Sequence, residues 1–487
     1  MNTVFITLSL IAAAFFSCEP TSEPTPKPST PETFDVYGYT STASRSMTFN
    51  ESGVNFFTGG NMSPNTIRIY PDVKYQTIDG FGAALTGASC YNLLRMPPAD
   101  RSAFMKEIFD TVDGLGLSYV RVSIGCSDFS LSEYTCCDRQ GIENFALTSE
   151  ELNYVIPILK EALAYNPNIK VLGSPWTAPR WMKVSEKGGS APYNSWTGGH
   201  LNTAYYQDYA TYFVKWIRAF EAQCVPVYAI TIQNEPLNSG NSASMLMEWD
   251  EQRDFIKNAL GPKLQQAGLH TKVFVFDHNY NYDDISSQND YPIHIYNDGD
   301  AEQYVAGAAY HHYGGTRAEL SDIHNQRPGK DLIFSEGSIG TWNSGRDLEN
   351  NFTREVEEGI DLVAKWCKAV IVWNLMLDMN GAPNRPGGCT TCFGAVDIAS
   401  DYKSITRNTH YYEIGHLSKV VKAGAVCIKA DGYSPSGLVY QAFRNPDGSH
   451  ALVVLNKSNA EITFVAEDDT HSFSYSLQPK AAVSLRW

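Results

Sequence analysis

Short apolar strands and long helical segments alternate through most of this 487-residue chain. From Gln76 onward, apolar runs such as residues 170–172 and 229–232 are each followed by a segment with helical periodicity. This alternation is typical of α/β folds with parallel strands, and its extent fits a (β/α)8 barrel. A doubly wound open sheet usually carries a glycine-rich phosphate loop after a strand, and no glycine run here has that placement. We therefore predict a (β/α)8 (TIM) barrel over residues 76–414.

The segments on either side of this barrel have strand patterns instead. Residues 66–70 alternate as a strand, and residues 438–443 and 451–455 flank a turn at residues 445–448, which is typical of a hairpin. We predict that residues 35–75 and 415–487 together form one β-sandwich beside the barrel.

Charge and composition narrow the choice of partner. The chain carries 53 acidic and 37 basic residues, a formal charge of −16, so its average field repels phosphate backbones and anionic surfaces. Its 28 Tyr, 23 Phe and 9 Trp suit stacking on flat ligands such as sugar rings. We expect no nucleic-acid partner, and the aromatic content favours a carbohydrate.

The N-terminus has the features of an export signal. Residues 4–16 are apolar but too short to span a bilayer, and Cys18 follows in a context that resembles a bacterial lipoprotein processing site. No Lys or Arg precedes the apolar run, which departs from that pattern. Residues 19–34 are rich in Pro, Thr, Ser and Glu. We predict a signal peptide with a lipoprotein-type cysteine (1–18), a flexible tether (19–34), and an exported monomer.

The predicted export signal and lipid anchor together indicate where in the cell the protein should lie. We expect the protein at the outer membrane, the cell surface or the periplasm of a Gram-negative bacterium, with membrane contact only through the anchor.

The cysteines leave several possibilities open. Of ten cysteines, nine remain without Cys18, so at least one thiol is free. The Cys136-Cys137 pair and the Cys389/Cys392 pair could be disulfide partners or loop staples in an oxidising compartment. No Cys or His spacing completes a four-ligand zinc site, so we predict no metal and no cofactor.

Two predicted strands end in a glutamate. Residues 229–232 lead into Asn234 and Glu235, and residues 331–334 lead into Glu336. In a parallel barrel, the carboxyl ends of the strands form the edge where chemistry is done. Glycoside hydrolysis with retention needs two carboxyl groups about 5–5.5 Å apart, one as acid and one as nucleophile. The pattern alone does not separate these roles, nor does it exclude two unrelated buried glutamates.

Aromatic residues follow three other predicted strands: Trp176, Tyr313 and Trp373. Converging on one barrel mouth, they would form a sugar-binding platform, whereas an isolated Trp is more often part of a core. His311 and His312 could be a metal pair, but adjacent strand residues point to opposite faces, which disfavours it.

Seven motifs carry a specific resemblance. They are GFGAALTGAS (80–89), YVRVSIGCSDFSLSEYT (119–135), SPWTAPRWMK (174–183), TIQNEP (231–236), FSEGS (334–338), VIVWNLMLD (370–378) and HYYEIGHLSKVVKAGA (410–425). In this order they resemble glycoside hydrolase family 30, the retaining glycosidases that include glucosylceramidases and β-1,6-glucanases. The resemblance implies a (β/α)8 barrel fused to a side β-sandwich.

The resemblance also implies roles for individual residues. Glu235, after the fourth strand, would be the general acid/base, and Glu336, after the seventh, the nucleophile. The other implied substrate-site residues are Asn234 on the sugar 2-hydroxyl, Arg121 and Tyr313 on Glu336, and Trp176 and Trp373 as walls of the subsite for the cleaved sugar.

Three departures concern the substrate. Many glucosylceramidase-like members have an Asp where this chain has Gly87, and a Trp where it has His312, which we expect beside the pocket. Residues 385–392 and the Cys136-Cys137 segment resemble the β-1,6-glucanase branch. We predict an endo-β-1,6-glucanase acting on β-1,6-glucan. The alternatives are an exo-β-glucosidase or glucosylceramidase of the same family, and a non-catalytic surface glycan-binding protein.

Overall fold

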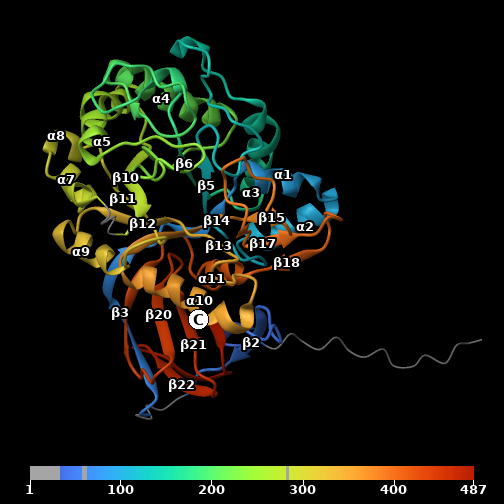
Figure 1. The fold of residues 1–487 in the computed structure, drawn as a ribbon. Helices are drawn as coiled ribbons and strands as arrows, with labels where there is room; N and C mark the ends of the chain where they lie inside the picture. Colours follow the sequence, from blue (N-terminus) through green and yellow to red (C-terminus); the bar gives the residue numbers. More distant parts are fainter. Residues whose placement is uncertain (1–32, 58–62, 281–284) are drawn as a thin grey trace, which may run out of the picture.

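A computed structural model describes residues 33–57, 63–280 and 285–487. The predicted signal peptide and residues 19–32 of the predicted tether lie outside the described residues. The described chain forms a barrel with a β-domain packed beneath it (Figure 1). Within these ranges, no helix is both long enough and apolar enough to cross a bilayer.

The barrel closes from eight parallel strands, which confirms the predicted (β/α)8 architecture. In chain order they are β4 (Gly80–Ala84), β5 (Tyr119–Ser123), β6 (Lys170–Ser174), β9 (Ala229–Thr231), β10 (Lys272–Asn279), β11 (Gly307–His311), β12 (Asp331–Glu336) and β14 (Cys367–Asn374). A buried layer inside the barrel draws on all of them except β4, with Leu172, Phe274 and Ile333 among its members.

Strand β4 was not predicted, because its glycines and alanines lack the β-branched signature of a strand. The packing explains the small residues. A Cβ on Gly82 would lie 1.7 Å from the carbonyl oxygen of Tyr119 on β5, so only glycine fits at this close approach.

Helices surround the barrel as the periodicity predicts. They are α1 (Gly87–Arg95), α2 (Pro98–Phe109), α3 (Ile156–Tyr165), α4 (Tyr206–Ala222), α5 (Trp249–Phe255), α6 (Gly261–Gln266), α7 (Tyr291–Tyr296), α8 (Gly299–Glu302), α9 (Ala318–Gln326), α10 (Leu348–Ala364) and α11 (Thr409–Ser418). Helix α5 begins at Trp249. Glu248 and Glu251 form a capping box there, which fixes the start.

The two ends of the chain share one β-domain, as predicted. Its nine-stranded sheet has the order β2-β1-β24-β21-β20-β19-β3-β22-β23. The strands are β1 (Val36–Thr42), β2 (Asn50–Val54), β3 (Thr66–Thr77), β19 (Val426–Gly432), β20 (Leu438–Arg444), β21 (His450–Asn456), β22 (Ile462–Glu467), β23 (Ser472–Leu477) and β24 (Ala481–Arg486). The hydroxyls of Thr40 on β1 and Tyr475 on β23 lie 2.7 Å apart, so the sheet curls around its core.

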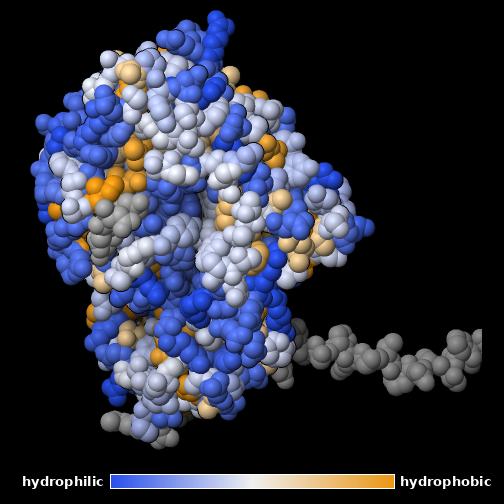
Figure 2. All heavy atoms as spheres, viewed as in Figure 1, coloured by the Kyte–Doolittle hydropathy of each residue, from blue (hydrophilic) through white to orange (hydrophobic). Residues whose placement is uncertain are grey.

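Three small sheets shape the loops above the barrel. They are β7 (Lys183–Val184) with β8 (His200–Leu201), β13 (Ile339–Gly340) with β16 (Cys392–Phe393), and β15 (Met376–Asp378) with β17 (Val396–Ile398) and β18 (Ile405–Arg407). The face seen in Figure 2 is mostly hydrophilic, with hydrophobic residues in small separate groups.

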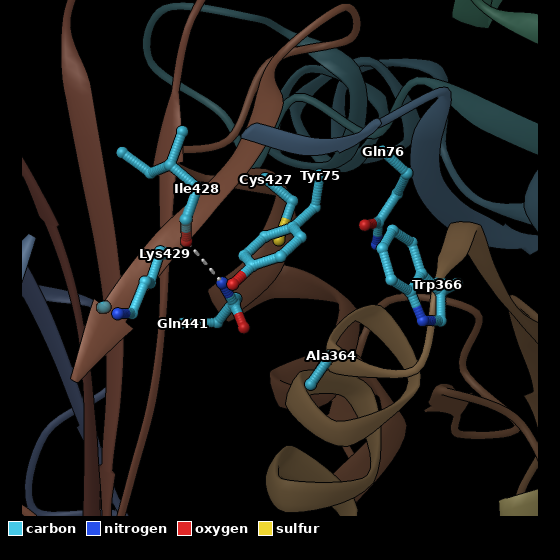
Figure 3. A pocket seen from close by; sticks show the side chains of 9 residues that line it. Tyr75, Gln76, Ala364, Trp366, Cys427, Ile428, Lys429 and Gln441 are labelled. Atoms are coloured by element: carbon cyan, nitrogen blue, oxygen red, sulfur yellow. Dashed lines mark hydrogen bonds between the residues drawn. The ribbon is translucent and has the colours of Figure 1, made fainter. Parts of the chain in front are cut away.

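Helices α10 and α11 lie between the barrel and the β-domain (Figure 1). A cavity of about 260 Å³ lies at the same junction, lined by Tyr75, Gln76, Trp366 and Gln441 among others (Figure 3). Gln76 and Trp366 come just before strands β4 and β14, so this cavity lies at the amino-terminal end of the barrel. It is therefore on the side opposite the predicted catalytic edge.

Candidate active site

The two predicted glutamates lie at the carboxyl ends of the fourth and seventh barrel strands, after β9 and at the end of β12. Both are buried. Glu235 has a left-handed backbone, with φ of 45°, and its amide donates to the carbonyl oxygen of Asp277 at 2.9 Å. This turn points the carboxylate back over the barrel.

Glu336 receives a donor on each oxygen. Arg121 Nη1 donates to Oε2 at 2.5 Å, and the Tyr313 hydroxyl donates to Oε1 at 2.8 Å. Arg121 is wholly buried. Burial alone would lower the pKa of Arg121, but Asp277 and Glu336 raise it. The two donors therefore hold the Glu336 carboxylate in one orientation.

Arg121 also fixes the orientation of Asn234. Its Nη2 donates to Asn234 Oδ1 at 2.7 Å. A guanidinium is only a donor, so the amide oxygen must face it and the amide NH2 is turned away. Asn234 therefore directs a hydrogen-bond donor away from Arg121.

Asp277 is the centre of the buried polar network, and no prediction named it. One oxygen accepts from Arg121 Nη2 at 2.8 Å and Thr231 Oγ1 at 2.6 Å, and the other from His311 Nε2 at 3.0 Å and Ser335 Oγ at 2.6 Å. Burial alone would raise its pKa, but Arg121, His311 and Ser335 hold the pKa well below the usual range. Asp277 follows the largely apolar run 272–276, so the strand-end rule that found the glutamates could have found it.

The surroundings of Glu235 are rich in donors. The side-chain amides of Asn238 and Asn241 donate to Oε2 at 2.8 and 3.1 Å, and His311 Nδ1 lies 3.6 Å from Oε1. Burial raises the pKa of Glu235, but His311, His278 and Asn238 outweigh it and bring the pKa to about 2. Burial lowers the pKa of His311, but Glu336, Asp277 and Glu235 raise it to about 9. In the free protein the proton of the Glu235/His311 pair therefore resides on the imidazole.

The two predicted tryptophans adjoin this network. The rings of Trp176 and Trp373 stack with centroids 5.3 Å apart, and the Arg121 guanidinium lies 4.9 and 5.3 Å from them. Only 1% of Trp176 and 4% of Trp373 is exposed. The buried indole N–H of Trp176 has no hydrogen-bond partner in the part of the chain that the structure describes, so it remains available to a ligand at the inner end of the site.

His312 contacts helix α10, and its predicted place beside the substrate stays a prediction. Its Nδ1 is 2.9 Å from Glu358 Oε1 on α10, and its ring packs against Phe334. Neighbouring strand residues point to opposite faces, so His311 points into the barrel and His312 points out to the helix. Tyr313, one residue further on, returns to Glu336.

The substrate departures noted in the sequence have structural counterparts. A Cβ on Gly87 would lie 1.9 Å from Glu150 Oε1, so the buried Glu150 occupies the space of a side chain there. Burial raises the pKa of Glu150 to about 7. Asp128 is a second buried acid, and the charges of Glu336 and Glu235 add to burial in raising its pKa.

The loop of residues 385–392 borders the site. A disulfide joins Cys389 and Cys392, whereas Cys136 and Cys137 are free and buried. Arg385 donates to Glu133 at 2.8 Å, and the Ser242 hydroxyl donates to the carbonyl oxygen of Pro386 at 3.0 Å. The loop is therefore attached to the segment that carries the amides around Glu235.

Among the described residues, one group of three His, Cys, Asp or Glu side chains has metal-ligand spacing, and it lies away from this site, on α10 and α11. The chemistry available around Glu235 and Glu336 is that of two carboxyl groups, hydrogen-bond donors and aromatic rings. A (β/α)8 barrel with such a pair defines a glycoside hydrolase.

Comparison with known sequences identifies the family to which this glycoside hydrolase belongs. Residues 78–421 match the glycosyl hydrolase family 30 TIM-barrel domain, and residues 424–485 match the glycosyl hydrolase family 30 beta sandwich domain. The chain belongs to glycosyl hydrolase family 30, as its motifs predict, and a retaining mechanism is typical of this family.

Three relatives illustrate the similarity. A solved endo-β-1,6-glucanase is 57% identical, with a TM-score of 0.90 over 93% of this chain and 99% of that one. An endo-1,6-β-D-glucanase of Neurospora crassa is 32% identical over 418 residues, 82% of this chain and 83% of the relative. The lysosomal acid glucosylceramidase of Mus musculus is 27% identical over 436 residues, 85% of this chain and 81% of the relative.

Proposed function

We propose that this glycoside hydrolase is a retaining endo-β-1,6-glucanase that cleaves β-1,6-glucan. The observation that carries the proposal is the 57% identity to a solved endo-β-1,6-glucanase over 93% of the chain. The donor set around Glu336 and the amide of Asn234 supply the groups that the chemistry needs.

In the proposed mechanism, Glu336 attacks the anomeric carbon and Glu235 protonates the leaving oxygen. Arg121 and Tyr313 donate to its two oxygens and keep Glu336 oriented. Asn234 donates to the sugar 2-hydroxyl, an interaction that strengthens in the oxocarbenium-like transition state. Water then hydrolyses the glycosyl-enzyme while Glu235 acts as base.

The acid step needs a proton on Glu235, although the free protein holds it on His311. His311 Nδ1 is 3.6 Å from Glu235 Oε1, so a small movement brings the two within hydrogen-bond distance. A bound sugar excludes water from this pair, which favours a neutral carboxyl and a neutral imidazole over two charges. The proton then moves from His311 to Glu235 before it reaches the leaving oxygen.

Export also belongs to this proposal. The apolar run before Cys18 and the Pro- and Thr-rich segment after it support an exported, lipid-anchored monomer of a Gram-negative bacterium. In a bacterial host, we expect the wild type to incorporate radiolabelled palmitate and Cys18→Ala to incorporate none. Equal labelling of both would refute the anchor.

Substitution of each glutamate tests the catalytic assignment. We expect Glu235→Gln and Glu336→Gln each to lower kcat on β-1,6-glucan by at least about 1,000-fold. An aryl glucoside with a good leaving group should rescue the first step in Glu235→Gln but not in Glu336→Gln, because such a group needs no proton. Glu349→Gln, at an exposed position of α10, is the control. Near wild-type kcat in either active-site variant would overturn the assignment.

A glucosylceramidase is the second candidate, since the mouse enzyme is similar over 85% of this chain. Gly87 and the adjacent Glu150 argue against it, because they replace the side chain that the resemblance places there. Sizing the first products from linear β-1,6-glucan distinguishes the candidates. Oligosaccharides of mixed length support the endo-glucanase, whereas glucose alone, or turnover only of glucosylceramide, would refute it.

A further inference from the structure

A second cluster of ionisable side chains lies between the two helices that join the barrel to the β-domain. Glu355 is on α10, and His410 and Glu413 are on α11. At most 3% of each side chain is exposed. The proposed hydrolysis uses none of the three.

The distances in this cluster suit ligands around a common centre. His410 Nε2 lies 3.7 Å from Glu355 Oε2 and 3.6 Å from Glu413 Oε2, and one ligand atom from each residue lies within 4.8 Å of the others. These separations exceed the ordinary hydrogen-bond range of about 2.7–3.2 Å. Zinc bonds of about 2.0–2.2 Å at tetrahedral to trigonal angles place neighbouring ligand atoms about 3.3–3.8 Å apart.

Glu413 is the side chain whose surroundings require a partner. Both of its carboxylate oxygens are buried, and neither has a hydrogen-bond partner among the described residues. Its Cγ lies 3.0 Å from the position of a Cβ on Gly359 of α10, so the two helices pack closely at this carboxylate. An unpaired buried carboxyl group is costly, and a cation would offset that cost.

The neighbouring residues are compatible with a cation. Arg354 binds Glu355 through Oε1, which leaves Oε2 directed at His410. His410 directs Nε2 toward both carboxylates, and an imidazole nitrogen is a common metal ligand.

We propose that Glu355, His410 and Glu413 bind a divalent transition-metal ion that fastens α10 to α11. Two carboxylates and one imidazole form a donor set suited to zinc, whereas calcium and magnesium prefer oxygen ligands alone. His410 and Glu413 are three residues apart on one helix, a spacing that directs both side chains to the same neighbour. The sequence prediction of no metal rested on Cys and His spacing, which does not reveal a site assembled from two helices.

Zinc uptake by the intact protein tests this site. Purified tag-free protein is stripped with chelator, loaded with zinc chloride and freed of excess by gel filtration, and zinc is counted by mass spectrometry. We expect about one ion per chain and a rise in Tm of about 2–5 °C that chelator reverses. No retained zinc in the wild type would overturn the proposal.

Matched variants locate the ion. His410→Gln and Glu413→Gln should each fold by circular dichroism and lose the zinc and the Tm increment, whereas Glu349→Gln on α10 should keep both. The two ligands are replaced separately, so that if one variant misfolds, the other variant still tests the site. Wild-type zinc content in a folded variant of either ligand would place the ion elsewhere and overturn the proposal.

Discussion

Replacing Asp277 with Asn tests whether the buried network holds the catalytic groups in place. Its two oxygens accept from two donors each, and these donors come from four different barrel strands or strand ends. An asparagine keeps one acceptor but turns an NH2 group toward the other pair of donors. Arg121 and His311 both lose the negative charge of Asp277, and in either orientation one of them faces an NH2 group instead of an acceptor.

The size of the effect follows from that burial. Removing one member of a buried ion pair typically costs about 3–5 kcal/mol, because the remaining charge is left without compensation. Arg121 holds both Glu336 and Asn234, so a displacement of about 1 Å should also lower kcat/KM about 100-fold. We expect Asp277→Asn to show both losses, with Tm lowered by about 3–5 °C.

The assay pairs hydrolysis of β-1,6-glucan with thermal unfolding, and Asp79→Asn is the control. Asp79 accepts from Lys170 Nζ at 2.7 Å and from the Tyr228 hydroxyl at 3.0 Å, just before β4 at the opposite end of the barrel. It should lower stability by about 1–2 kcal/mol and leave kcat/KM within about twofold. If Asp277→Asn keeps wild-type kcat/KM, or if Asp79→Asn loses activity to the same extent, the network does not position the catalytic groups.

Three further outcomes are expected. First, the Glu235/His311 pair must hold one proton for the acid step, so kcat/KM should persist below pH 9 and fall as pH rises through the His311 pKa of about 9. In a pH–rate profile, His311→Asn should move this alkaline fall in kcat/KM to lower pH. A fall at an unchanged pH would contradict the pairing. Second, the double variant Cys389→Ser/Cys392→Ser should lose about 1–2 kcal/mol of stability and have a raised KM, whereas Cys224→Ser, at an exposed free cysteine, should change neither. Equal KM values in the double variant and the wild type would show that the loop does not contact the substrate. Third, Gly87→Ala should lower stability by about 1–3 kcal/mol because of Glu150, and adding Glu150→Ala should restore most of it; additive losses in thermal unfolding would refute the contact.

The barrel and the paired glutamates were predictable because both depend on local patterns. Alternation of strands and helices gives the barrel, and polar residues directly after an apolar strand mark its catalytic edge. Strand β4 was not predicted because its close packing against β5 requires small residues, which have low strand propensity. The shared β-domain followed from strand patterns at both ends of the chain.

Residue contacts across the barrel were harder to predict. The outward position of His312 follows from strand alternation, yet its position next to Tyr313 in the sequence suggested a shared place at the substrate. Asp277 sits at an irregularity of β10, where Phe276 and Asp277 both have positive φ and the register with β11 shifts. In a regular strand, the direction of the side chain at position 277 would follow from simple alternation. The strand pattern alone therefore does not predict that Asp277 reaches Arg121 and His311 together.

This irregularity also explains why the polar network is shared rather than divided between the two glutamates. Arg121 touches Glu336, Asn234 and Asp277, and His311 touches Asp277 and faces Glu235. Asp277 thus joins the cation that supports the proposed nucleophile to the imidazole that supplies the proposed acid. Because one carboxylate holds both, a change that frees Arg121 also frees His311, and the two half-reactions of the double displacement should weaken together.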